Sequence, residues 1–496
     1  MRRQGQLSSL AWTAVLLLLL VVLVPECSSF ATTPSPLTRR QVASTTSSQR
    51  QASVALPADA ASQANNKNQA SENSDDPKVG VLLLNLGGPE TGDDVEGFLF
   101  NLFADPDIIR LPGLLSPLQT LIATFISKRR APKSRAAYES IGGGSPILQY
   151  SNAQAKLISE SLAKRHGISV QTYIGMRYWH PFTEDALKQI QRDHIDALVI
   201  VPLYPQFSIS TSGSSFRVLQ EEFSKDASKF GDMVHTVVSS WYDRPGYVNA
   251  MTKLIEHELQ SFTEEQIQEA QSTAPDLEPL HILFSAHGVP QSYIEAGDPY
   301  QTQIMACVDR ITNAITHPHV QVHLSYQSRV GPIEWLRPYT DDVLPELAQK
   351  GVRNLVVVPI SFVSEHIETL EEIDIEYREL AEESGITNWR RCPALNTEAS
   401  FIDDMADMVM DALEEPAQTV TEACVANNVG DVELQPLDER VGISTVGVGG
   451  VGAGDEEVLL KEPERLLARI AIAGVFITFL VELFSGSSMV DLFFGS

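Results

Sequence analysis

The chain has 496 residues, more than one typical domain, and 43% of them are hydrophobic, which is enough for a sizeable buried core. Its 36 Lys and Arg residues are outnumbered by 64 Asp and Glu residues, so the formal net charge is −28. A field of this sign repels nucleic-acid phosphates and argues against a nucleic-acid-binding protein. The four cysteines show no C-x-x-C spacing, which disfavours a zinc ribbon or a cysteine-held iron–sulfur cluster.

Residues 1–76 have the composition of targeting segments. Residues 1–29 combine Arg2 and Arg3 with an apolar run too short to span a membrane comfortably, which is typical of a signal peptide. Residues 30–76 are rich in Ser, Thr, Ala and Gln, which is typical of a transit peptide. Together they resemble the bipartite presequence of algae with secondary plastids, so we expect import into a plastid. A secreted protein with a disordered N-terminal linker is the alternative.

From Lys78 onward, apolar runs of strand length alternate with helix-length segments. This pattern predicts an α/β fold in which helices cover both faces of a parallel sheet. The predicted strands lie within Val79–Pro89, Val170–Gly175, Ala197–Leu203, Met233–Val238, His281–Ser285, Val320–Tyr326 and Leu355–Phe362.

A faint internal repeat divides this region. The run Leu198–Pro202 recurs as Leu355–Pro359, and in each half an apolar strand runs into a glycine turn. We therefore expect two similar Rossmann-like, doubly wound domains, residues 78–245 and 246–415, that face each other across a cleft. Ligands of such folds bind at the carboxyl ends of the strands.

A histidine follows one of the predicted strands. His287 lies in the glycine turn Ser285–Pro290, where a neutral imidazole can accept a proton or bind a metal. A hydrogen-bonded structural histidine is the alternative.

A carboxylate row follows another predicted strand. Glu368, Glu372 and Glu376 have the spacing i, i+4, i+8, which stacks three carboxylates along one face of an α-helix. Such a row can relay protons or guide a divalent cation inward. A solvated acidic helix face is the alternative.

The ordered set of motifs resembles the ferrochelatase family. The matching segments are Asn85–Glu90, Tyr138–Ile147, Gly175–His180, Tyr204–Ser215, Ser285–Tyr300, Gln327–Trp335 and His366–Tyr377. The resemblance implies that the chain inserts Fe²⁺ into protoporphyrin IX, which gives protohaem and releases two protons. Animal members hold an iron–sulfur centre with a cysteine where this chain has Ile209. We therefore expect a cluster-free enzyme of the plant and cyanobacterial kind, with no permanently bound cofactor.

The resemblance also implies roles for individual residues. His287 and Glu368 are expected to act in catalysis from opposite sides of the cleft and to bind the metal together with Glu372 and Glu376. Whether His287 or Glu368 takes the protons stays open. The residues expected to bind the porphyrin substrate are Arg130, Tyr138, Ser145, Arg177, Tyr178, Trp335 and His366.

The C-terminus carries a second apolar segment. Residues 416–461 predict a flexible linker, and residues 462–486 predict a single transmembrane helix. The segment around Glu464 and Arg469 resembles the chlorophyll-binding helix of light-harvesting proteins, which implies chlorophyll or carotenoid binding and pairing of such helices. One pigment ligand of that family is replaced by Leu467. A plain membrane anchor or dimerisation helix is the alternative.

These interpretations predict haem synthesis at a plastid membrane, the thylakoid or the inner envelope. Expected partners are protoporphyrin IX, Fe²⁺, the membrane and a second copy of the chain, with no nucleic acid. Two other functions stay open: another type II chelatase that inserts cobalt or nickel into a tetrapyrrole, and a non-catalytic thylakoid tetrapyrrole-binding protein.

Overall fold

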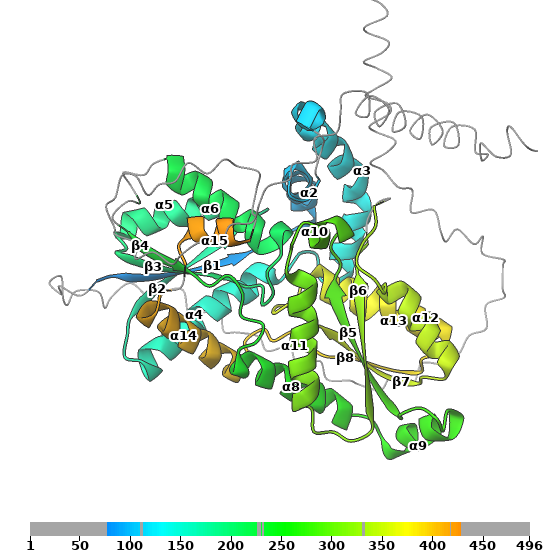
Figure 1. The fold of residues 1–496 in the computed structure, drawn as a ribbon. Helices are drawn as coiled ribbons and strands as arrows, with labels where there is room; N and C mark the ends of the chain where they lie inside the picture. The colour runs from blue at the N-terminus through cyan, green and yellow to red at the C-terminus, as the bar shows by residue number, and fades with distance from the viewer. Residues whose placement is uncertain are drawn as a thin grey trace, which may run out of the picture. The chain divides into compact units, whose positions relative to one another are not determined.

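The computed structural model describes residues 77–109, 113–225, 230, 233–329, 333–416 and 418–427 (Figure 1). The predicted targeting segments at 1–29 and 30–76 and the predicted transmembrane helix at 462–486 lie outside these residues. Within the described ranges, no helix combines the length and the hydropathy needed to cross a membrane.

The first half of the described chain contains a parallel four-stranded sheet with the strand order β2-β1-β3-β4. Its strands are β1 (Val79–Asn85), β2 (Val170–Met176), β3 (Ala197–Pro202) and β4 (Val234–Val237). The central strands β1 and β3 are continuous apolar runs because both of their faces are covered. All four strands were predicted from the sequence.

The second half repeats this topology in a sheet with the strand order β6-β5-β7-β8. Its strands are β5 (Leu280–His287), β6 (Val320–Gln327), β7 (Asn354–Pro359) and β8 (Asn388–Arg391). The predicted repeat is therefore confirmed. The sequence did not predict β8, because this short edge strand has Trp389 as its one large apolar residue.

Alternate side chains of the central strands enter different cores. Val81 of β1 packs into a core that also contains Ile282 of β5 and Val356 of β7, so the two sheets share it. Leu82 points the opposite way, into a core confined to the first half. The equivalent outer core of the second half contains Leu283. The shared core joins the two predicted domains into one packed unit.

Helices cover both faces of each sheet (Figure 1). The shared core contains side chains of α4 (Ile147–Arg165), α8 (Pro245–Gln260), α11 (Tyr300–Ala314) and α14 (Ala399–Glu414). The outer cores contain side chains of α5 (Thr183–Asp193), α6 (Ser214–Lys225) and α15 (Val420–Ala426) in the first half, and of α12 (Thr340–Lys350) and α13 (Arg378–Ser384) in the second. The other helices are η1 (Gly92–Asp94), α2 (Val95–Ala104), η2 (Gly113–Leu118), α3 (Gln119–Ser140), α9 (Glu264–Thr273), α10 (Gln291–Glu295) and the π-helices η3 (Ile209–Gly213) and η4 (Glu368–Tyr377).

The end of the described chain returns to the first half. In α15, Val420, Ala423 and Cys424 are buried in the core of that half. The Val237 N–H of β4 donates to the Gln418 carbonyl at 2.8 Å. The prediction of a flexible linker from residue 416 onward is therefore wrong for its first residues, because the spacing of these three apolar residues gives α15 a buried face.

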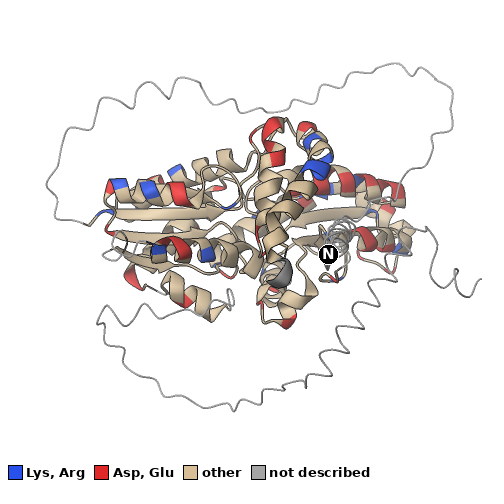
Figure 2. Ribbon diagram, turned by 90° about the horizontal axis from the view of Figure 1, so that it is seen from above, with Lys and Arg blue, Asp and Glu red and all other residues tan. Residues whose placement is uncertain are grey.

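Charged side chains lie mainly on the helices that surround the sheets, whereas the central strands carry none (Figure 2). Most of the negative charge of the described part therefore lies on solvent-facing helices. The acidic residues of η4, which continues from β7 toward α13, are the exception considered next.

Candidate active site

His287 and Glu368 meet at the carboxyl end of the second sheet. His287 ends β5, and Glu368 begins η4 in the segment that follows β7. The imidazole Nδ1 and the carboxylate Oε2 lie 2.7 Å apart, with side chains 33% and 23% exposed. The expectation that they act from opposite sides of a cleft is wrong, because β5 and β7 are neighbours in one sheet. The strand order reverses between these two strands, which is where open α/β sheets bind ligands.

Two hydroxyl groups fix the backbone of His287. Its N–H donates to Ser361 Oγ at 3.0 Å, and the Tyr300 hydroxyl donates to its carbonyl oxygen at 2.9 Å. The Tyr300 and Ser361 oxygens lie 2.7 Å from each other. The histidine is therefore held in place on both sides of its Cα, which is the kind of support that a precise reaction geometry needs.

A second carboxylate, Glu372, shares its hydrogen-bond donors with Glu368. Ser328 Oγ lies 2.6 Å from Glu372 Oε2 and 3.3 Å from Glu368 Oε2. Gln327 Nε2 lies 3.3 Å and 3.4 Å from the same two oxygens. The Tyr377 hydroxyl donates to Glu372 Oε1 at 2.9 Å. The two carboxyl groups therefore converge on one pair of donors beside His287.

The helix that carries these carboxylates is a π-helix, η4, and not the α-helix that the sequence predicts. In this π-helix, side chains four and five residues apart both meet: Glu368 and Glu372 share donors, and the Tyr377 hydroxyl bonds to Glu372. Glu376 Oε1 lies 4.0 Å from Nζ of Lys133 on α3. The shared donors of Glu368 and Glu372 agree with the predicted alignment of these two carboxylates, and the alignment of Glu376 with them stays a prediction.

The π-helical spacing also brings forward a residue that the sequence did not single out, Glu371. Burial and the charge of Glu376 raise the pKa of Glu371 to about 7, although Lys133 opposes the shift. A search of this segment for acidic residues five apart would have found Glu371 and Glu376, but nothing in the sequence indicates a π-helix there.

Burial and charge give the central groups different proton affinities. Burial alone would lower the pKa of His287, but the carboxylates of Glu368 and Glu372 raise it overall. Burial opposes ionisation of Glu368, yet His287 and His366 lower its pKa to about 2. Burial and the Glu368 charge raise the pKa of Glu372 to about 7. Near neutral pH, Glu368 is ionised beside the imidazole while Glu372 exchanges a proton.

A family model described as ferrochelatase matches residues 78–413, which include all of these residues. The chain belongs to the ferrochelatase family. It is 58% identical over 339 residues to Ferrochelatase-2, chloroplastic, of Oryza sativa subsp. indica, an alignment that covers 68% of this chain and 62% of that protein. The chain thus spans less than two thirds of the length of this rice relative.

Cyanobacterial ferrochelatases align over more of the chain. The protein of Trichodesmium erythraeum is 50% identical over 413 residues, which cover 82% of this chain and 97% of that protein. The protein of Synechocystis is 51% identical over 411 residues, with the same two coverages. Both alignments are longer than the region matched by the family model, so some residues outside 78–413 are shared as well.

Three residues expected to contact a ferrochelatase substrate lie beside the pair. Tyr138 of α3 is buried, and burial and the charge of Glu368 raise its pKa. His366 is also buried, with its ring 4.4 Å from that of Phe362, which in turn lies 6.2 Å from the His287 ring. Trp335 forms an antiparallel bridge with Pro290, in the turn that follows His287.

Two other residues expected to contact the substrate, Arg130 and Ser145, lie in the first half of the described chain. Arg130 is exposed on α3, with its guanidinium carbon 5.5 Å from the centre of the Phe103 ring. The Ser145 N–H donates to the Pro89 carbonyl at 2.7 Å, in the turn that follows β1. Both residues are only partly covered, which leaves surface for contact with a ligand.

Arg177 and Tyr178 instead belong to a buried ion-pair network. Asp105, with a fully buried side chain, accepts hydrogen bonds from Arg177 Nη2 at 2.6 Å, the Tyr178 hydroxyl at 2.8 Å and Arg217 Nη2 at 2.8 Å. The Tyr178 side chain is 0% exposed. Its expected contact with the porphyrin is therefore not supported, because the structure gives Tyr178 no surface for a ligand. Arg177 keeps a small exposed fraction of 17%.

Among the described residues, no three His, Cys, Asp or Glu side chains converge as they would in a metal site. His287, Glu368, Glu372 and Glu376 therefore do not form one preassembled set of metal ligands. The expected pigment-binding pair, Glu464 and Arg469, lies outside the described residues.

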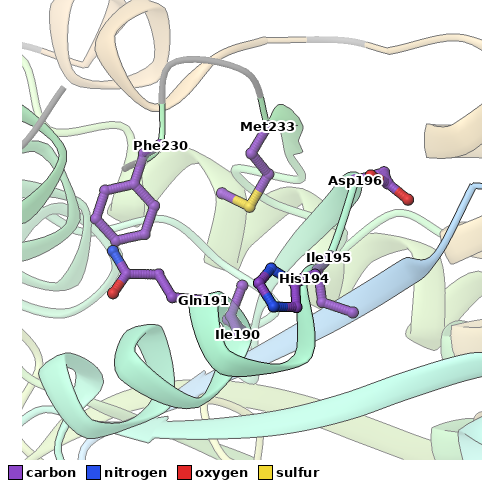
Figure 3. A pocket seen from close by; sticks show the side chains of 7 residues that line it. All are labelled: Ile190, Gln191, His194, Ile195, Asp196, Phe230 and Met233. Atoms are coloured by element: carbon purple, nitrogen blue, oxygen red, sulfur yellow. The ribbon is translucent and has the colours of Figure 1, made fainter. Parts of the chain in front are cut away.

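Two hollows of the surface lie elsewhere. One, of about 340 Å³, is lined by Ile190, Gln191, His194, Ile195, Asp196, Phe230 and Met233 (Figure 3). It lies where β3 and β4 begin, at the opposite end of the sheet from the strand ends that carry the motifs. A second hollow, of about 660 Å³, lies over α4, β2 and α5. Neither is lined by a residue of the candidate site.

Proposed function

We propose that this chain inserts Fe²⁺ into protoporphyrin IX to give protohaem, the terminal step of haem biosynthesis. The observation that carries this proposal is the contact of His287 with Glu368, beside Glu372, at the strand ends of a ferrochelatase-family chain. The reaction removes two pyrrole protons and replaces them with one Fe²⁺. It needs proton acceptors and transient metal ligands at the same place, and imidazole and carboxylate groups serve as both.

The pair divides these tasks between its atoms. The contact with Glu368 occupies Nδ1 of His287, so Nε2 is the ring nitrogen that takes a pyrrole proton. The carboxylate oxygens of Glu368 and Glu372 suit Fe²⁺, which binds oxygen and imidazole ligands weakly enough to be passed on. The pKa of Glu372 near 7 allows this group to release a proton to solvent between turnovers. No resident cofactor takes part in these steps.

The substrate lies against groups around the pair. Trp335, which is half-buried, supplies aromatic surface for a flat macrocycle, whereas Tyr138 and His366 are 4% and 9% exposed and present only a small part of their rings. Ser145 and Arg177 supply polar contacts at its edge. Arg130 on the exposed surface of α3 suits a propionate group, because a guanidinium binds a carboxylate with two parallel hydrogen bonds. An iron–sulfur cluster is not part of the proposal, since the position of the family's cluster cysteine is held by the buried Ile209.

The enzyme acts in a plastid, at the thylakoid or inner envelope membrane. The composition of residues 1–76 and the names of the rice and Arabidopsis relatives, which are called chloroplastic, support this location. Residues 462–486 anchor the chain as a transmembrane helix, where Glu464 and Arg469 hold chlorophyll or carotenoid and pair with a second copy. Substitution of Arg469 should then weaken dimers in detergent, whereas unchanged dimer content contradicts this part of the proposal.

The direct test is an anaerobic assay of the full chain with Fe²⁺ and protoporphyrin IX, followed by the absorption spectrum of haem. Parallel reactions with Co²⁺ and Ni²⁺, and with a less oxidised tetrapyrrole, test the alternative of another chelatase. We expect the highest turnover with Fe²⁺ and protoporphyrin IX. Porphyrin binding without metal insertion would instead support a non-catalytic tetrapyrrole-binding protein.

A further inference from the structure

Gln327 occupies an unusual place next to the candidate site. It is the last residue of β6, directly opposite His287 of β5 in the parallel register. Its carbonyl accepts the Gly288 N–H at 2.9 Å, and a Cβ on Gly288 would lie only 2.7 Å from that oxygen. The side chain is buried, with 1% exposed. The glycine therefore allows this close approach of the two strands, which fixes Gln327 beside the histidine.

The amide of Gln327 is oriented from behind by a chain of buried hydroxyl groups. Ser285 Oγ donates to Gln327 Oε1 at 2.7 Å and lies 3.0 Å from Thr340 Oγ1, which in turn lies 2.9 Å from Ser325 Oγ. All three hydroxyl residues are fully buried. These three hydroxyl groups contact neither Glu368 nor Glu372, so their effect on the two carboxylates passes through Gln327.

The opposite end of the amide faces the carboxylates. Nε2 lies 3.4 Å from Glu368 Oε2 and 3.3 Å from Glu372 Oε2. If the amide were turned over, Oε1 would face two carboxylate oxygens, and three acceptors would repel each other. The Ser285 hydroxyl and the two carboxyl groups thus select the same orientation.

We propose that Gln327 is a positioning residue, whose amide holds the Oε2 atoms of Glu368 and Glu372 together beside His287 for reception of the metal substrate. This inference rests on the proposed function. Gln327 is not a catalytic residue, since it acts through the two carboxylates. Partners that orient metal ligands in this way commonly change metal affinity or activity by about 10-fold to 100-fold when they are removed.

The test uses Gln327→Met, which keeps the length of the side chain and removes the amide. We expect KM for Fe²⁺ to rise by about 10-fold while KM for protoporphyrin IX stays within about twofold. The matched control is Gln154→Met. Gln154 is an equally buried glutamine whose Nε2 donates to Ser364 Oγ at 3.1 Å and to the Asn396 carbonyl at 2.8 Å. Its replacement should lower stability and leave KM for Fe²⁺ unchanged.

Ser285→Ala provides a second variant that keeps Gln327 itself. It removes the hydroxyl that orients the amide, so KM for Fe²⁺ should rise in the same direction by a smaller factor. Near-UV circular dichroism checks that each variant folds. Equal KM values for Fe²⁺ in the wild type and both variants overturn the proposal, as does a parallel rise in both KM values.

A titration with Co²⁺ alone, followed by the visible absorption of the bound metal, separates this inference from the proposed function. We expect Gln327→Met to weaken Co²⁺ binding by about 10-fold. If the wild type inserts no iron yet Gln327→Met still weakens Co²⁺ binding, the proposed function fails and the positioning role stands. If the wild type inserts iron and Gln327→Met leaves Co²⁺ affinity and KM for Fe²⁺ unchanged, the positioning role alone fails.

Discussion

In both halves of the described chain the first strand pairs with the third in the same register: Leu84 lies opposite Pro202, and Ser285 lies opposite Pro359. This register makes Leu86 the counterpart of His287, and each is followed by a glycine and, two residues later, a proline. The two sheets have the same topology, but where the strand order reverses the first sheet presents an apolar side chain and the second presents an imidazole.

The segments after the third strands extend the comparison. Both halves contain a π-helix there, but η3 (Ile209–Gly213) carries hydroxyl residues, whereas η4 carries the carboxylates Glu368, Glu371, Glu372, Asp374 and Glu376. In the first half, buried charge is neutralised by the Asp105 network. In the second half, the Glu368 carboxylate contacts the imidazole of His287, and both side chains remain partly exposed. The two halves therefore differ at the strand ends, where the second presents an imidazole–carboxylate pair, whereas each half also contains a buried ion pair, that of Arg391 and Glu365 in the second.

The largest expected effect comes from the reactive half. His287→Ala removes the proton acceptor and the partner of Glu368, so kcat for iron insertion should fall by about 100-fold or more. Because His287 is one-third exposed, the melting temperature should change little. Iron insertion by the variant at near-normal turnover would remove His287 from the mechanism.

The next effect lies in the first half and concerns stability. Asp105→Asn leaves Arg177 and Arg217 facing a neutral amide in a buried position, which should lower the free energy of unfolding by about 3 kcal/mol. Urea denaturation measures this loss. An unchanged free energy of unfolding would contradict the claim that the Asp105 network stabilises the first half.

A pH profile sharpens the contrast between Glu368 and Glu372. Glu372 has a pKa raised to about 7, so it is protonated below this pH and ionised above it. If it accepts protons during turnover, kcat/KM should rise with pH through about 7, and Glu372→Gln should abolish this rise. A rise that persists in the variant assigns the titration to another group, of which Glu371 is the first candidate.

The smallest effect concerns the opposite end of the second sheet. His281 Nδ1 and His323 Nε2 lie 2.9 Å apart between β5 and β6, and burial lowers the pKa of both, that of His323 to about 4. Below about pH 6.5 these two histidines bind more protons in the unfolded chain than in the folded one, so their contribution to stability falls as pH falls. Because the raised pKa values of Glu371 and Glu372 act in the opposite direction in both proteins, the test is a difference: between pH 7.5 and pH 5.5 the change in melting temperature of the wild type should be more negative than that of His323→Gln by about 3 °C.

The sequence predicted those features that depend on local pattern. Continuous apolar runs identified β1, β3, β5 and β7, and the rule that ligands bind at strand ends directed attention to His287 and Glu368. Strand order is not a local property. Their direct contact therefore could not be read from the chain, because β7 pairs with β5 and not with the preceding strand β6.

Other errors had similar causes. The spacing of Glu368, Glu372 and Glu376 predicted an α-helix because no local signal marks the π-helix. Tyr178 was expected at the substrate because it matches a cleft position of the family, and its buried hydrogen bond to Asp105, far away in the sequence, has no local signal. The helix α15 was not predicted because it lies in a polar stretch of the sequence and is buried by contact with α6 and β4.

The most direct test of the division between the two halves is a comparison of Glu368→Gln with Asp105→Asn in one anaerobic Fe²⁺ insertion assay, with melting temperatures measured on the same samples. We predict that Glu368→Gln loses insertion activity by about 100-fold and keeps its melting temperature. Asp105→Asn should melt earlier while its folded fraction still inserts iron. Near-normal turnover in Glu368→Gln would contradict the assignment of the chemistry to the His287–Glu368 pair.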